Sequence, residues 1–200
     1  MSNKLQSLDS IEAIGGNPRQ ESQDAVKKEY NDGLQFLEKQ EFGQAALAFH
    51  NALLGFEERQ DEAGIANASN QIGHLCLSRK DYEGALKHYE RALLICDKLN
   101  DRMSSLAVLQ KIVAARKGLK KYDEAIAASM KMLDLYQDNR DPQGSVTTLE
   151  EIAEIYLEAG KKEKAAGTYK VIGSIHKNFQ HDSIAAKYME KAAQLAQVVD

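Results

Sequence analysis

The sequence predicts an all-α protein built from repeated pairs of helices. Two series of residues recur every 40 positions, and the apolar residues within each copy are spaced by three and four, as on one face of a helix. The two series are Ala45, Ala85, Ala125 and Ala165, and, twelve positions earlier in each copy, Gly33, Gly73, Val113 and Ala153. The register never slips, so we expect one supersecondary unit to be repeated along the chain.

The apolar spacing predicts nine helices, at about 23–39, 42–58, 62–79, 82–98, 102–118, 122–138, 142–160, 162–178 and 182–198. These form four pairs, in repeats at about 23–60, 61–100, 101–140 and 141–180, and an unpaired final helix in 181–200. Asp61, Asp101, Asp141 and Asp182 are placed to cap the helices that follow them. Residues 23–200 are therefore expected to form a single repeat domain.

Residues 1–22 fall outside the 40-residue period and are interpreted as a leader. A mobile tail is the favoured interpretation. The alternative is a short apolar segment, made by Leu5, Leu8, Ile11 and Ile14, that folds back into a groove.

Composition excludes several classes of protein. The 200 residues are 43% hydrophobic and 28% charged, which excludes a disordered chain, and the net charge of −4 argues against a nucleic-acid surface. No apolar run reaches the roughly 18 residues of a membrane span. The first thirty residues lack a secretory signal, so we expect no membrane association and a cytoplasmic location.

Two segments carry a family resemblance. Gly33, Phe36, Ala45, Phe49 and Ala52 in copy one, and Gly73, Cys76, Ala85, Tyr89 and Ala92 in copy two, resemble the tetratricopeptide repeat (TPR) pattern. The 40-residue length is similar to the longer variant found in kinesin light chains. The resemblance implies a right-handed α-solenoid of antiparallel helix pairs, with an Ala where the two helices of each pair cross.

Copies one and three depart from the pattern. In copy three, Val113 and Ser129 stand where a small and an aromatic residue are expected, so large and small residues have partly exchanged places and the packing angle should differ. In copy one, the polar residues Glu29, Asp32 and Gln35 occupy apolar positions of later copies. A solvated first helix explains them, because nothing stacks before it.

No catalytic or cofactor motif is present, and the five histidines lack metal-ligand spacing, so we predict neither an enzyme nor a bound cofactor or metal. A basic cluster of Arg116, Lys117, Lys120 and Lys121 has two interpretations. The cluster could bind an acidic partner. It also lies at the C-terminus of a helix, where the helix dipole favours cations, and this second interpretation is preferred.

By resemblance, the first helices of the pairs line a concave groove that receives peptides. The corresponding residues here are Asn67, Asn70, Gln71, His74, Gln110, Lys111, Lys117, Thr147, Glu150, Glu151, Glu154 and Glu158. Some family members hold a terminal carboxylate with Lys, Asn and Arg at set positions of this groove. Here Asn70, His74 and Glu151 stand in such places, so a chaperone C-terminus is not the expected ligand.

These residues predict a non-catalytic adaptor that binds a peptide or helix of another protein, carrying Lys or Arg at one end. The alternative is a chaperone or assembly factor that shields a client in the same groove. Met189, Ala192, Ala193 and Ala196 of the final helix are expected to lack a covering helix, which predicts a monomer or a weak two-fold dimer.

Overall fold

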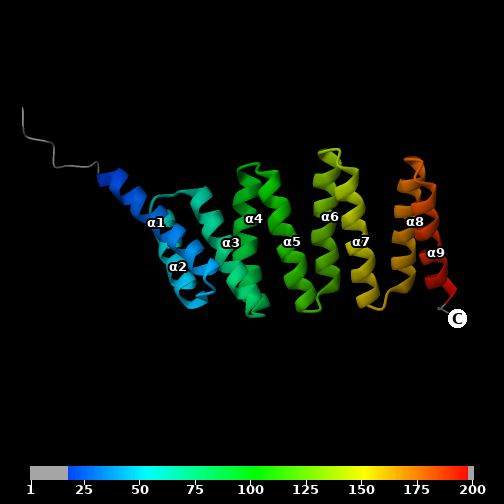
Figure 1. The fold of residues 1–200 in the computed structure, drawn as a ribbon, viewed down its shortest axis with the longest axis horizontal. Coiled ribbons are helices and arrows are strands. Elements are labelled where there is room, and N and C mark those ends of the chain that lie inside the picture. The colour runs from blue at the N-terminus through cyan, green and yellow to red at the C-terminus, as the bar shows by residue number, and fades with distance from the viewer. Residues whose placement is uncertain (1–17, 198–200) are drawn as a thin grey trace, which may run out of the picture. The chain divides into compact units, whose positions relative to one another are not determined.

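The computed structural model describes residues 18–197, which alternate between helices and short turns (Figure 1). Within these residues the helices are α1 (Pro18–Glu38), α2 (Phe42–Glu58), α3 (Glu62–Ser78), α4 (Tyr82–Lys98), α5 (Arg102–Gly118), α6 (Tyr122–Asp138), α7 (Pro142–Glu158), α8 (Lys162–Asn178) and α9 (Asp182–Gln197). Each end lies within two residues of its predicted position, except the start of α1. The all-α fold of antiparallel helix pairs with a final unpaired helix is confirmed.

The first helix begins earlier than the sequence pattern indicates. We expected it at about residue 23, but α1 begins at Pro18, inside the predicted leader. Proline is favoured in the first turn of a helix because its fixed φ suits the helix and its missing N–H has no partner to lose there. The apolar positions of the leader, Leu5, Leu8, Ile11 and Ile14, lie outside the described residues.

The chain divides into two compact units, one ending at Gly64 and the other beginning at Ile65. In the first unit α1 packs against α2, and Gly33 allows this because a Cβ there would lie 2.7 Å from the ring of Phe49. In the second unit, consecutive helices from α4 to α9 pack side by side (Figure 1). Both units therefore bury their apolar faces between neighbouring helices.

The alanines predicted at the helix crossings are completely buried. Ala45, Ala85, Ala125 and Ala165 are each 0% exposed. A larger side chain at such a position would hold the two helices of its pair apart, which explains why the same residue recurs in all four copies.

Copy three keeps its core by exchanging large and small residues, as predicted. Val113 and Ser129 are both 0% exposed, and the Ser129 hydroxyl donates to the carbonyl of Ala125, 3.2 Å away. The aromatic residue at this position in copy two is Tyr89, which faces Gly73. The valine therefore fills space that a glycine leaves to an aromatic ring elsewhere.

Every turn between helices contains one residue in the left-handed region, and these residues recur every 20 positions with φ between 54° and 73°. They are Gln40, Gln60, Lys80, Asn100, Lys120, Arg140, Gly160 and Gln180. The hydrogen bonds follow the Schellman pattern: Lys161 N–H donates to the carbonyl of Tyr156 and Gly160 N–H to that of Leu157. The 40-residue repeat thus contains two helix-turn units of identical length.

Three of the four predicted aspartate caps are present. The carboxylates of Asp61, Asp101 and Asp141 accept from the backbone N–H three residues later, at 2.9, 3.0 and 2.9 Å. The prediction for Asp182 is wrong, because His181 lies at that position of the repeat and Asp182 is the first residue of α9. Its charge still suits the positive end of the helix dipole.

The final helix is only partly uncovered. Ala192 was expected to lack cover but is 0% exposed, because it packs with Tyr169 and Ile172 of α8. Met189, Ala193 and Ala196 are exposed, as predicted. Helix α8 therefore buries one side of α9, and the opposite side stays exposed.

Candidate functional site

The twelve groove residues predicted from the sequence lie on α3, α5 and α7, and we call them the polar face. All twelve are in the second compact unit, and none is fully buried. Asn67, Gln110, Thr147, Glu154 and Glu158 are exposed, and the other seven are half-buried. Side chains held at partial burial are accessible to a ligand and also restricted by their neighbours, which favours binding.

His74 of α3 is held in its neutral form. Its ring meets the ring of Tyr89 edge to face, with centroids 5.7 Å apart and planes at 87°. Burial, and then the charge of Lys111 on α5, lower the pKa of His74 below its ordinary value. A neutral imidazole offers one hydrogen-bond donor and one acceptor, so this part of the polar face is suited to an uncharged group such as a peptide backbone.

Lys117 of α5 forms an ion pair with an acidic residue of α7. Its Nζ lies 3.0 Å from Oε1 of Glu158. Burial raises the pKa of the nearby Glu151; the charge of Lys117 offsets part of this rise and that of Glu158 adds to it. The other lysine of the polar face, Lys111, acts on His74 instead. The two lysines therefore act on different neighbouring helices.

Two tyrosines that the sequence analysis did not single out bind the acidic residues. Tyr169 of α8 donates its hydroxyl to Oε1 of Glu154 at 2.6 Å, and Tyr188 of α9 donates to Oε1 of Glu150. Burial first, and then these hydrogen bonds, raise the tyrosine pKa values, that of Tyr188 to about 12. Both hydroxyls therefore stay protonated and orient the carboxylates of α7.

The two tyrosines also form an aromatic cluster with a cation. Their rings stack with centroids 6.1 Å apart, and Nζ of Lys191 lies 4.8 Å from the centre of the Tyr169 ring. One signal of this arrangement was in the sequence: Tyr169 follows Glu154 by 15 residues, as Tyr89 follows His74. The Tyr188 contact had no such signal, because it depends on how α9 packs beside α7.

Comparison with known proteins identifies the repeat. The tetratricopeptide repeat family model matches residues 68–103. A kinesin light chain-related protein of Arabidopsis thaliana is 30% identical over 135 residues, which are 64% of this chain and 19% of that protein. Residues 68–103 therefore form a tetratricopeptide repeat. The chain spans about a fifth of the length of this plant relative.

Solved structures share the TPR fold. A Podospora anserina protein described as a kinesin light chain, with nearly identical TPR-like repeats, has a TM-score of 0.66 and 11% identity, covering 88% of each chain. The Rap conjugation gene regulator of the plasmid pLS20, solved with the Phr* peptide, has a TM-score of 0.61 and 12% identity, covering 98% of this chain and 60% of its own. These likenesses support the right-handed solenoid of helix pairs.

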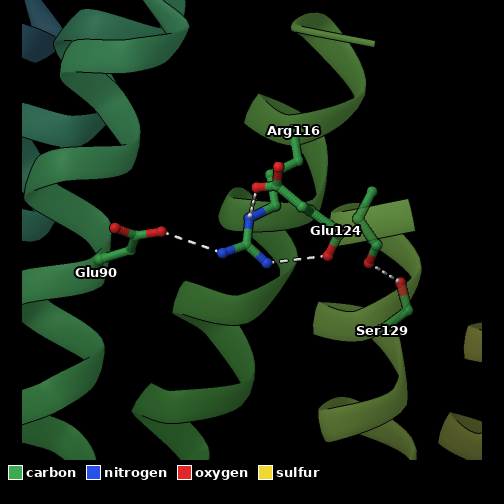
Figure 2. A network of polar contacts seen from close by, with 5 residues as sticks. Glu90, Arg116, Glu124 and Ser129 are labelled. Atoms are coloured by element: carbon green, nitrogen blue, oxygen red, sulfur yellow. Dashed lines mark hydrogen bonds and ion pairs between the residues drawn. The ribbon is translucent and has the colours of Figure 1, made fainter. Parts of the chain in front are cut away.

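Arg116 stands in this TPR protein where Phe36 and Tyr156 stand in copies one and four. Figure 2 shows its guanidinium between Glu90 of α4 and Glu124 of α6: Nη2 lies 3.1 Å from Oε1 of Glu90, and Nη1 donates to the backbone carbonyl of Glu124 at 2.9 Å. Of the basic cluster, Arg116 and Lys117 are thus paired within the protein. The contacts of these two residues therefore favour a structural role within the protein over binding of an acidic partner.

Among residues 18–197, no group of three or more His, Cys, Asp or Glu side chains is arranged to hold a metal ion. The helices of this part of the chain are also too short or too polar to span a bilayer. What the polar face offers chemically is hydrogen bonding around His74 and negative charge along α7.

Proposed function

We propose that this TPR protein is a non-catalytic adaptor of the cytoplasm whose polar face binds an extended or helical segment of another protein. The observation that carries the proposal is the preorganised row of Glu150, Glu154 and Glu158, held by Tyr188, Tyr169 and Lys117. Side chains fixed before binding lose little conformational entropy when a ligand arrives. The Rap regulator of pLS20, which is similar in fold, forms a complex with the Phr* peptide, and this supports a peptide ligand here.

The expected ligand has Lys or Arg at one end. Four carboxylates of α7 lie on the polar face, and Lys117 pairs with one of them. Tyrosine hydroxyls donate hydrogen bonds but do not cancel charge, so the row stays negative. At the other end of the face, Asn70, Gln71 and the neutral His74 can bind backbone groups. Affinity should therefore depend strongly on salt.

The test is selection of binding segments from a displayed library of random 16-residue peptides, followed by calorimetry. We expect the selected peptides to be enriched in Lys or Arg at one end. The variant Glu150→Gln, Glu154→Gln, Glu158→Gln removes the charge but keeps oxygen acceptors for both tyrosines. It should weaken binding at least ten-fold without changing helical content.

A matched control removes three charges from second helices of the repeats: Glu83→Gln, Asp134→Asn and Glu163→Gln, all at exposed positions. This variant should bind as the parent does. Selected peptides that bind the α7 variant as tightly as the parent would remove the polar face as the binding surface. Protection of an aggregating client by the chain, without selection of any peptide, would favour the chaperone alternative.

We also propose that the chain is a monomer or a weak two-fold dimer through α9, where Met189 is 39% exposed beside exposed alanines. Small side chains offer little area for a tight interface. A tight dimer in light scattering that Met189→Glu leaves unchanged would exclude this surface.

A further inference from the structure

The turn between α8 and α9 brings two histidines together. Nδ1 of His176 and Nδ1 of His181 are 3.4 Å apart. The backbone imposes this contact: Gln180 is left-handed, and the N–H of His181 donates to the carbonyl of His176 at 2.9 Å. In a Schellman turn these two positions normally make a side-chain contact, which here is a pair of imidazoles.

Both rings are held by aromatic neighbours. The His176 ring lies parallel to that of Tyr188, with centroids 5.6 Å apart and an interplanar angle of 3°. Tyr188 is itself fixed by its hydrogen bond to Glu150. The His181 ring stacks on Phe179 with centroids 6.3 Å apart. The two Nδ1 atoms are therefore positioned by both the backbone and the packing.

The separation of the two nitrogens suits a tetrahedral metal ion. With zinc–nitrogen bonds of about 2.0–2.1 Å and a tetrahedral angle, two ligating nitrogens lie about 3.4 Å apart. A hydrogen bond between the two rings is the alternative for this pair, and its usual length is about 2.7–3.2 Å. Beside the pair is a hollow of ≈ 110 Å³, lined in part by Gln143 of α7 and by Phe179. This has room for an ion and two water molecules of about 30 Å³ each.

We propose that Nδ1 of His176 and Nδ1 of His181 bind one Zn²⁺ ion, with water in the remaining two positions. Both rings then carry their proton on Nε2, so the lone pairs of both Nδ1 atoms are free for the metal. The ion would close the α8–α9 turn and tie the last helix to the repeat before it. Because no third protein ligand is gathered among the described residues, the affinity should be modest.

The experiment is calorimetric titration of the full chain with ZnCl₂ under reducing conditions. We expect one ion per chain. His176→Gln and His181→Gln should each weaken zinc binding ten-fold or more. The double variant should bind zinc about as weakly as either single variant. The control His88→Gln, on α4, should bind as the parent does.

Nitrogen-15 spectra of the histidine rings identify the metal-bound atom. Addition of zinc should shift Nδ1 of both His176 and His181, and should raise the melting temperature of the parent but not of the two variants. Three results would each overturn the proposal. They are zinc binding that is unchanged in the double variant, no binding at 0.1 mM zinc, which is roughly a hundred-fold above a micromolar dissociation constant, and a shift at Nε2 instead of Nδ1.

Discussion

Copies two and four place a tyrosine at the same buried position but give its hydroxyl different surroundings. Tyr89 is 0% exposed and its hydroxyl has no hydrogen-bond partner, whereas Tyr169, at 2% exposed, donates to Glu154. The residue fifteen positions before the tyrosine makes the difference: His74 presents its ring to Tyr89, while Glu154 presents a carboxylate to Tyr169. The same packing position is apolar in one copy and polar in the other.

This contrast separates what the repeat requires from what it leaves variable. The ring of the tyrosine fills the core in both copies, and the crossing alanines beside it are identical. The hydroxyl reaches the polar face, where the neighbouring residue decides its role. Sequence variation at that residue therefore changes the chemistry of the polar face without changing the fold.

Ala85→Phe should have the largest effect, because it attacks the feature that the two copies share. Ala85 is 0% exposed at the crossing of α3 and α4, so a phenyl group must push the helices apart at a cost of about 1–3 kcal/mol or more. Chemical denaturation followed by circular dichroism measures this loss. Ala127→Phe, at an exposed position of α6, is the control and should unfold as the parent does. Equal unfolding of the two variants would show that Ala85 is not at a close crossing.

Removing the two tyrosine hydroxyls should have different effects on stability. Tyr169→Phe loses a hydrogen bond to a carboxylate and should destabilise by about 1 kcal/mol. Tyr89→Phe removes a buried hydroxyl that has no partner, so it should be neutral or stabilising. The free energy of unfolding of each variant checks this, with Glu154→Ala expected to resemble Tyr169→Phe. A similar loss in both tyrosine variants would contradict the assigned difference.

Most helix ends could be predicted from the sequence because the 40-residue period repeats them and local caps mark several of them. Asp101 and Asp141 cap α5 and α7 within three residues of sequence, so their pattern suffices. The left-handed residues were harder to predict, since Lys80 and Arg140 are not residues that favour positive φ. The hydrogen bond of Tyr188 to Glu150 was out of reach, because it joins two helices 38 residues apart through lateral packing.

The turns inside copies two and four offer a smaller test. Lys80 and Gly160 occupy the same left-handed position, with φ of 61° and 73°. A side chain strains this conformation and glycine does not, so Lys80→Gly should stabilise and Gly160→Ala should destabilise, each by about 0.5–1 kcal/mol. Melting of the two variants beside the parent checks the pair. Lys87→Gly, at an exposed position in the interior of α4, is the control for glycine itself and should destabilise.

The smallest effect concerns His74 and its charge. Because the pKa of His74 is lowered in the folded chain by burial and by Lys111, the unfolded chain binds the proton more readily. Stability contributed by the neutral ring is therefore present above the ordinary pKa of 6.5 and is lost as the pH falls below it. Glu151 acts in the opposite sense, since its raised pKa means that the folded state is the better proton acceptor and stability falls as the pH rises above 4.5. The measurement that isolates His74 is the difference in unfolding free energy between the parent and His74→Gln from pH 7.5 to 5.0. This difference should shift against the parent as the pH falls, because only the parent must pay for a charged imidazole beside Lys111. A difference that stays constant over this range would mean that His74 has the same pKa in the folded and unfolded chain. The argument that a neutral His74 binds uncharged groups on the polar face would then be wrong.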